Sequence, residues 1–478
     1  MDTININLKE KHKISPYLYM QFMEPLGASD GSVDAAWDFI ENDWYEAVVD
    51  EIKRLSPTMI RFGGAFASYY HWKEGVGPQK DRIPMINHCW GGKYFNQVGT
   101  HEFADLCRRV GSEPLLVVNM ESEGLNFWQY PKNDTVRKGT SDEAAECVSY
   151  CNSPDNTLRL SHGVEKPYNI KYWQVGNETS YSVLGKIGMN ADECYEVTSR
   201  FGEAMKKQDS SIRIIGWGDT SSIGENWCKK MSDVDCVDML AFHHHFGSGL
   251  DNSPLTTTQY RKNPENTWTH LMNAHRSIDE HILKLKADCK SKRLAMTEGH
   301  FIPGRARNEI LSSWAAGVAY ARCHNVLMRH SDVLEIATLA DFMGNVWQCN
   351  ALILPTPMIE GNKCYLQPVG EVMRLFGAHQ GKKALDVSTN ASLDITASKT
   401  DNKIFLHIAN TSMNNSVRVK IDIGEAVIKN AVMHYIAEDP ETEITPANIG
   451  CFEEKCADIE NGVVTVPKAA VAAIDIEI

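Results

Sequence analysis

Short segments rich in β-branched and aromatic residues alternate with longer segments of helical periodicity, and this alternation is the strongest constraint on the fold. Helical segments include residues 44–55, 100–111, 193–208 and 309–330. Strand-like segments occupy residues 15–24, 58–64, 114–120, 170–178, 212–218, 237–245, 293–300 and 333–342. Strands that alternate with helices form parallel sheets, because a crossover helix returns the chain to the same end of the sheet. Eight such units predict a (β/α)8 TIM barrel.

A doubly wound sheet is the alternative arrangement of the same segments. No glycine-rich phosphate loop follows any of the strand-like segments, which favours the barrel. After about residue 380 the pattern changes to short alternating segments joined by Asn, Asp and Gly turns, typical of an antiparallel β-sandwich. The opening segment TININLK has the same character and would add an edge strand to it. We therefore predict a catalytic barrel over residues 16–375 and a jelly-roll-like β-sandwich domain formed by residues 1–15 and 376–478.

Charge and apolar patterning exclude several classes of partner. The chain has 48 basic and 62 acidic residues, a net charge of -14, which disfavours binding to nucleic acid or to an anionic membrane surface. No run of about 20 apolar residues occurs, and the amino terminus lacks the pattern of a secretory signal. The 13 cysteines are scattered without a CxxC pair, which favours reduced thiols. A cytoplasmic protein is the expectation.

Polar side chains stand at the ends of several predicted strands. They are Glu24, Arg61, Asn177, Glu178, His243, His245, Glu298 and, just past the last strand, Gln348. The carboxyl ends of barrel strands meet at one mouth, where the active sites of such barrels lie. Two facing carboxyls are what glycosidic bond cleavage needs, one protonated and one ionised. Glu178 and Glu298 are the candidate pair, although a single glutamate at a strand end can equally be a helix cap or a surface charge.

Sequence motifs around these two glutamates resemble those of a known enzyme group. WQVGNE (173–178) and AMTEGH (295–300) are similar to the acid/base and nucleophile strands of the clan A glycosidases. Further segments are similar to glycoside hydrolase family 51, the α-L-arabinofuranosidases, and extend the resemblance over nearly the whole chain. They are YHWKEGVGPQKDR (70–82), NHCWGG (87–92), GTHEFADLCRRVGSEP (99–114), RHSDVLEIATLADFMGNVWQCNALIL (329–354) and MRLFGAHQG (373–381).

The resemblance implies a retaining double displacement. Glu178 would be the general acid and then the base, and Glu298 the nucleophile, with the carboxyls about 5–5.5 Å apart. Asn177 would bind the sugar 2-hydroxyl. Arg61 would lie against the nucleophile and keep it ionised, which leaves Glu178 with the higher pKa.

Three positions depart from the family pattern around this pair. Glu24 matches a substrate-binding glutamate that is normally followed by His, whereas Pro25 follows here. Ala65 stands where the family has Asn or Cys, and His245 replaces a Tyr that orients the nucleophile. A strand period of two places His243 and His245 on one face, with His243 at a substrate-facing position.

The remaining candidate residues are matched less specifically. Gln348 resembles the last sugar-binding residue of the family, with a loop-stabilising amide as the alternative. Trp90 could present its ring to a sugar or pack in the core. The three consecutive histidines, 243–245, could suggest zinc, but neighbouring strand residues point to opposite faces and no carboxylate or Cys stands at ligand spacing. We expect neither a metal nor an organic cofactor.

The sequence therefore predicts an exo-acting retaining glycosidase that removes terminal α-L-arabinofuranosyl residues from oligosaccharides. One alternative is the same machinery on another glycoside, such as a β-D-galactofuranoside, for which Ala65 could leave room. A non-catalytic carbohydrate-binding barrel is the alternative from another class, and it would not need a facing acid pair. The family resemblance also implies a homo-oligomer, often a hexamer.

Overall fold

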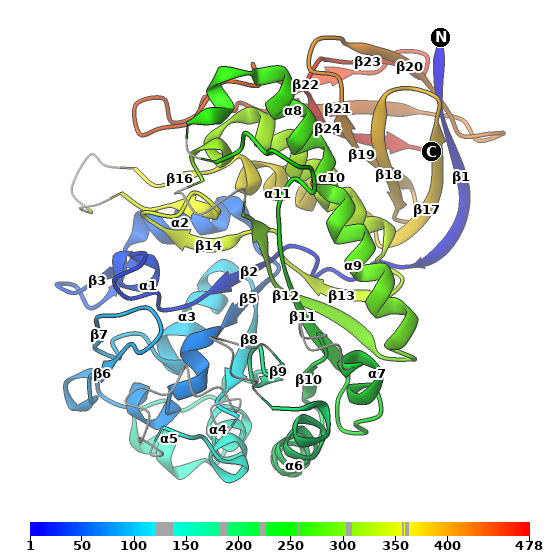
Figure 1. Ribbon diagram of the computed structural model, residues 1–478. Coiled ribbons are helices and arrows are strands. Elements are labelled where there is room, and N and C mark those ends of the chain that lie inside the picture. Colours follow the sequence, from blue (N-terminus) through cyan, green and yellow to red (C-terminus); the bar gives the residue numbers. More distant parts are fainter. Residues whose placement is uncertain are drawn as a thin grey trace.

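Figure 1 shows the structure, a computed structural model with an α/β body and a β-rich carboxyl-terminal part. It describes residues 1–120, 137–180, 189–219, 226–256, 258–302, 308–355, 358 and 363–478. Among these residues, no helix is both long enough and apolar enough to cross a bilayer.

Eight parallel strands form a closed ring, which confirms the predicted barrel. The strands are β2 (Met20–Met23), β5 (Met59–Phe62), β8 (Glu113–Val118), β9 (Tyr172–Val175), β10 (Arg213–Trp217), β11 (Met239–Phe246), β12 (Arg293–Phe301) and β13 (Leu334–Ala337), paired in this order. A parallel bridge between Tyr17 and Ile336 closes the ring. The carboxyl ends of the strands consequently meet at one mouth.

The segment predicted as one strand over residues 333–342 is divided in two. After β13, the strand β14 (Asp341–Gly344) starts anew and pairs with β2, and β15 (Asn350–Ile353) and β16 (Tyr365–Leu366) extend the sheet beyond it. The hydroxyl of Thr338 hydrogen-bonds both the N–H and the carbonyl of Ala340, at 3.3 and 2.9 Å. A side chain that engages its own backbone in this way competes with the strand ladder, so the strand breaks there.

Helices cover the outside of the barrel. The longer ones are α2 (Glu46–Leu55), α3 (Thr100–Val110), α4 (Ser141–Asn152), α6 (Ala191–Gln208), α8 (Pro264–Asn273), α9 (His275–Asp288), α10 (Trp314–Arg329) and α11 (Pro368–Ala378). Short helices are α1 (Ser32–Ala36), α5 (Thr157–Ser161) and α7 (Trp227–Met231). Two hairpins pair β3 (Trp37–Asp38) with β4 (Asp43–Trp44) and β6 (Met85–Ile86) with β7 (Lys93–Tyr94). Helix α10 is buried on nearly all sides because it packs between the barrel and the sandwich strands β18, β19 and β24, which agrees with its apolar sequence.

The carboxyl-terminal part is one nine-stranded sheet system with its own apolar core. Its strands, in sheet order, are β22 (Lys455–Asp458), β21 (Asn430–Ile436), β24 (Val471–Glu477), β19 (Lys403–Asn410), β18 (Leu393–Lys399), β17 (Lys383–Thr389), β1 (Asp2–Lys13), β20 (Val417–Asp422) and β23 (Val463–Val466). Alternate side chains from these strands form a separate hydrophobic cluster, to which β1 contributes Ile4 and Ile6. The domain boundaries at residues 15/16 and 375/376 stay a prediction, because sheet membership alone does not define a folding unit.

The amino-terminal strand is not an edge strand as the sequence suggested. Strand β1 runs antiparallel to β17 on one side and parallel to β20 on the other. The edge assignment was wrong because alternation shows which face of a strand is buried but not how many neighbours the strand has.

Candidate active site

A cavity of about 220 Å³ opens at the mouth of the barrel, where the strand ends converge. Its lining combines carboxylates, imidazoles and apolar side chains: Phe22, Glu24, Leu26, Ala65, Trp90, Glu178, His245, Glu298, His300, Ile302, Asp341 and Trp347. A concave site with few, convergent polar groups is the usual form of a small-ligand site. Five of the residues selected from the sequence lie in this lining: Glu24, Trp90, Glu178, His245 and Glu298.

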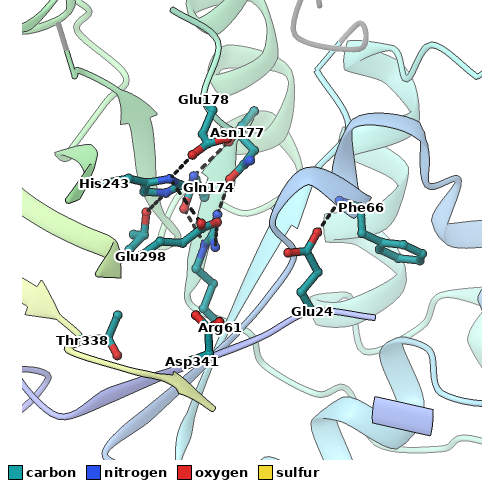
Figure 2. Close-up of polar contacts among 12 residues, drawn as sticks. Glu24, Arg61, Phe66, Gln174, Asn177, Glu178, His243, Glu298, Thr338 and Asp341 are labelled. Atoms are coloured by element: carbon teal, nitrogen blue, oxygen red, sulfur yellow. Dashed lines mark hydrogen bonds and ion pairs between the residues drawn. The ribbon is translucent and has the colours of Figure 1, made fainter. Parts of the chain in front are cut away.

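Arg61 organises the floor of this site (Figure 2). The side chain is fully buried at the end of β5, and its Nη1 donates to Glu298 Oε1 at 2.9 Å. Its Nη2 donates to Asn177 Oδ1 at 2.7 Å and its Nε to Gln174 Oε1 at 2.9 Å, while the ring of Phe22 lies 4.9 Å from the guanidinium. Because all three guanidinium nitrogens are engaged, Arg61 fixes Glu298 and Asn177 relative to each other.

Glu178 and Glu298 face each other across His243. An oxygen of each carboxylate and a ring nitrogen of His243 all lie within 4.8 Å of one another. His243 Nδ1 is 2.9 Å from Glu178 Oε1 and 3.5 Å from Glu298 Oε2. A close carboxyl pair of this kind matches the separation of about 5–5.5 Å in retaining glycosidases rather than the 6.5–9.5 Å of inverting ones. The same three groups could surround a cation, but Arg61 already supplies a positive charge to Glu298.

The backbone at both glutamates is irregular, and this irregularity aims the side chains. Glu178 has a φ of 55°, in the left-handed region that a residue with a side chain rarely adopts. In β12, the pairing with β11 shifts between Phe242 and His243, so that Thr297 is an extra residue and Glu298 pairs with His243. A β-bulge of this kind re-aims the side chain that follows it.

Burial and the Arg61 charge shift the pKa of each carboxyl in opposite directions. Burial raises the pKa of Glu178 and of Glu298, and the Arg61 guanidinium opposes that rise at both. Only Glu298 also accepts a direct hydrogen bond from Arg61, which favours its ionised form. This asymmetry agrees in direction with the predicted division of labour, in which Glu178 holds the proton.

His243 is suited to serve Glu178 in both of its protonation states. Burial lowers the pKa of His243 to about 3, so the ring is neutral near pH 7. Its Nε2 lies 3.0 Å from the hydroxyl of Thr297, which can donate or accept a hydrogen bond. When Glu178 is protonated it can donate to Nδ1 while Nε2–H donates to Thr297, and the tautomer reverses when Glu178 is ionised.

Glu24 reaches the cavity with its carboxylate already anchored. Its Oε1 accepts the backbone N–H of Phe66 at 2.7 Å and the indole N–H of Trp90 at 2.8 Å. Burial and the nearby Glu298 charge raise its pKa well above the usual value. Gly64 has a φ of 89°, and a Cβ at this residue would lie 2.4 Å from Glu24 Oε2. Only glycine therefore leaves room for the carboxylate, and the Trp90 ring packs edge-on against Trp347.

A histidine and an aspartate that the sequence analysis missed extend the site behind His245. His300 Nδ1 pairs with Asp341 Oδ1 at 2.9 Å, and the His300 ring packs against the His245 ring at 4.4 Å. Burial alone would lower the pKa of His300, but the Asp341 carboxylate outweighs it and raises that pKa. His245 Nε2 is 3.9 Å from Glu298 Oε2, too far for a hydrogen bond. Both missed residues stand at ends of predicted strands, so the strand-end rule could have found them.

His244, which the strand period placed on the opposite face from His243 and His245, and the candidate Gln348 lie outside the cavity. His244 points to the outer face of β11, where its Nε2 lies 3.2 Å from Ser277 Oγ on α9. Gln348 Oε1 accepts hydrogen bonds from Ser312 Oγ and Gln367 Nε2, both at 2.7 Å, and Gln348 does not line the cavity. The structure thus does not bring Gln348 together with the other candidates, and its contacts match the alternative of an amide that stabilises a loop.

Comparisons with known proteins agree with this architecture. The family model of the α-L-arabinofuranosidase 1 domain matches residues 51–265, and that of the α-L-arabinofuranosidase C-terminal domain matches residues 294–469. The chain is an α-L-arabinofuranosidase-like protein of glycoside hydrolase family 51.

Several curated proteins and solved structures are similar to this family 51 chain. An intracellular exo-α-(1→5)-L-arabinofuranosidase of Halalkalibacterium halodurans is 31% identical over 254 residues, covering 50% of this chain and 47% of that protein. An intracellular exo-α-L-arabinofuranosidase of Bacteroides ovatus is 25% identical over 476 residues, covering 90% and 85%. The chain therefore aligns with about half the length of the first of these relatives and with most of the second.

The solved structures establish the fold. An α-L-arabinofuranosidase from Thermotoga maritima, in complex with arabinose, superposes with a TM-score of 0.77 at 23% identity over the full length of both chains. A family 51 arabinofuranosidase from Xanthomonas axonopodis pv. citri gives a TM-score of 0.81 at 20% identity, also over both full lengths.

Proposed function

We propose that this family 51 protein is a retaining exo-glycosidase that removes terminal α-L-arabinofuranosyl residues from oligosaccharides. The observation that carries the proposal is the close pair of Glu178 and Glu298 in the mouth cavity, of which only Glu298 accepts a hydrogen bond from Arg61. The names of the two curated relatives support arabinofuranose as the sugar.

In the first displacement, Glu298 attacks the anomeric carbon and Glu178 gives its proton to the leaving oxygen. The glycosidic bond breaks as the bond between the anomeric carbon and the Glu298 oxygen forms. Asn177 binds the sugar 2-hydroxyl in this proposal. Its Nδ2 is buried and has no hydrogen-bond partner among the residues that the structure describes, so a donor is left for a ligand.

In the second displacement, Glu178 acts as a base and takes a proton from water, which attacks the anomeric carbon and releases Glu298. His243 and Thr297 support this change of role, because their hydrogen bonds can reverse when Glu178 gains or loses its proton. Glu24 and Trp90 bind the sugar in this proposal, the first as a hydroxyl acceptor and the second through its ring face.

A β-D-galactofuranoside is the second candidate substrate. Ala65 lines the cavity, and its methyl group leaves space that a larger polar side chain would fill. A galactofuranose carries one more exocyclic carbon than an arabinofuranose and could use that space. A non-catalytic binding barrel is disfavoured, because bringing two carboxyls together in a buried site costs stability without improving the binding of a neutral sugar.

For its cellular setting, we propose a cytoplasmic homo-oligomer, with a hexamer as the expected state. The relatives are named intracellular enzymes. Large apolar side chains are exposed on the β3–β4 and β6–β7 hairpins, as expected of an interface between copies: Phe39, Ile40, Ile83, Ile86 and Phe95. Light scattering after size-exclusion chromatography tests this state, and a monomer at micromolar concentration would contradict it.

A panel of 4-nitrophenyl furanosides and pyranosides tests the proposed activity. Fastest turnover is expected on the α-L-arabinofuranoside. Glu298→Ala should abolish turnover, whereas Glu178→Ala should still cleave substrates whose leaving group departs without protonation. Azide should rescue Glu178→Ala and give a glycosyl azide of retained configuration. An inverted azide, or no turnover of any glycoside, would refute the proposal.

A further inference from the structure

A second cluster of metal-ligating side chains lies far along the chain from the mouth, where the end of α11 meets the sandwich. Its members are His379 directly after α11, His434 on β21, and Glu454 and Cys456 at β22. His434 Nδ1 is 3.1 Å from Glu454 Oε1 and 3.3 Å from Cys456 Sγ. The rings of His379 and His434 lie 4.1 Å apart. One donor atom from each of His379, His434 and Glu454 falls within 4.8 Å of the others.

These donors suit zinc in kind and in spacing. Imidazole, thiolate and carboxylate are the protein ligands that zinc takes, usually four at a time in a tetrahedron. With Zn–N near 2.0–2.1 Å and Zn–S near 2.3 Å, tetrahedral ligand atoms stand roughly 3.3–3.7 Å apart. The separations from His434 Nδ1 to Glu454 and Cys456, 3.1 and 3.3 Å, are close to that range. The donor atoms of His379, His434 and Glu454 lie within 4.8 Å of one another, so metal binding would have to draw His379 and Cys456 further together.

Outer contacts already orient two of the ligands. Asp475 Oδ1 binds His379 Nδ1 at 2.8 Å, which leaves Nε2 of that ring for a metal. Arg374 donates to Glu454 Oε2 at 2.8 Å, so Oε1 is the oxygen that faces His434. Metal-bound histidines and carboxylates are typically held by such partners. Arg374 also binds Glu371, at 2.9 Å, so its charge is shared and does not act on the cluster alone.

We propose that His379, His434, Glu454 and Cys456 form a structural zinc site that fastens the end of α11 to strands β21 and β22. None of the four residues lines the mouth cavity, so the site is independent of the glycosidase activity. Binding releases the proton of the Cys456 thiol, because the thiolate is the ligand. Zinc neither gains nor loses electrons there.

Cobalt(II) is the probe for this site, because its absorption reports a thiolate ligand. The full-length protein, without a histidine tag and freed of metal by a chelator, is titrated with Co²⁺. A thiolate-to-cobalt band that saturates at one equivalent and disappears on addition of Zn²⁺ is expected. Cys456→Ser should lose the band, and His434→Ala should weaken binding about 100-fold or more. Asp475→Asn should weaken it about 10–100-fold, as expected for a partner that orients a ligand.

A control variant and a second readout keep the result decisive. His101→Ala on α3 removes a histidine elsewhere and should leave the titration unchanged. Cys456 is the one exposed cysteine of the thirteen, and Zn²⁺ should slow its alkylation in the wild-type protein, as followed by mass spectrometry. Zinc should also raise the Tm of the wild type but not that of His434→Ala. Absence of one-equivalent binding, or alkylation of Cys456 at the same rate with and without Zn²⁺, would overturn the proposal.

Discussion

Replacing Arg61 with methionine removes the guanidinium that donates to Glu298 and leaves that buried carboxylate without this partner. Three hydrogen bonds are lost, to Glu298, Asn177 and Gln174. Breaking a buried ion pair on one side costs about 3–5 kcal/mol. The Glu298 side chain keeps 10% of its surface exposed to the cavity, so water screens part of the loss and we expect a value near the lower end, about 3 kcal/mol.

The loss should depend on pH in a defined direction. Burial already raises the Glu298 pKa, and removing Arg61 raises it further. A carboxyl whose folded-state pKa lies above its unfolded-state value penalises folding at high pH, and the penalty fades as the pH falls towards the unfolded pKa of about 4.3. The difference in unfolding free energy between wild type and Arg61→Met should therefore be largest near pH 8 and smaller near pH 5.

The same change should appear in catalysis, because the nucleophile must be ionised. The acid limb of the kcat/KM profile on an aryl α-L-arabinofuranoside should move to higher pH in Arg61→Met. Urea unfolding and the pH profile are the two assays. Arg54→Met is the matched control, because Arg54 pairs with Glu51 and Glu371 but its side chain is 42% exposed. Its loss should lower the unfolding free energy by no more than about 1 kcal/mol and leave the acid limb of the pH profile unchanged. An unchanged acid limb in Arg61→Met would show that Arg61 does not keep Glu298 ionised.

Three other changes test separate parts of the structure. Ala65→Asn should improve the kcat/KM ratio of arabinofuranoside over galactofuranoside by about 1–2 kcal/mol, the scale of one hydrogen bond; an unchanged ratio would mean that this departure from the family pattern is silent. Deleting residues 1–12 removes β1 from between β17 and β20, so the protein should aggregate, and a truncated chain as soluble and thermostable as the full one would contradict the role of that strand. Gly64→Ala should displace Glu24 and raise KM with little change in the far-ultraviolet circular dichroism, whereas an unchanged KM would exclude Glu24 as a sugar ligand.

The barrel could be predicted from the sequence because its strands are short segments rich in β-branched and aromatic residues, and segments of helical periodicity separate them. The rule that strand ends meet at one mouth then placed Glu24, Arg61, Glu178 and Glu298 in a single site without any contact information. Their mutual distances could not be predicted in this way. They depend on the positive φ of Glu178 and on the bulge before Glu298, neither of which leaves a sequence signal.

Other features depended on contacts between distant segments. Gln348 turns away from the cavity because Ser312 and Gln367 offer it hydrogen bonds, and nothing near Gln348 in the sequence indicates those partners. The four proposed zinc ligands come from separate segments, with only Glu454 and Cys456 close in sequence. Metal binding was considered only at the three consecutive histidines, 243–245, so nothing in the sequence led us to expect this cluster.

In the proposed mechanism, Glu298 becomes covalently attached to the sugar while Glu178 gives and takes the proton. Glu178→Ala should accumulate this intermediate on an activated aryl arabinofuranoside. The activated group leaves without needing a proton from Glu178, whereas hydrolysis of the intermediate is slowed by the loss of the base. Rapid acid quenching, peptic digestion and mass spectrometry locate the sugar. One pentosyl group is expected on the peptide that contains Glu298. A pentosyl group on any other residue, or turnover with no adduct and an inverted product, would contradict this mechanism.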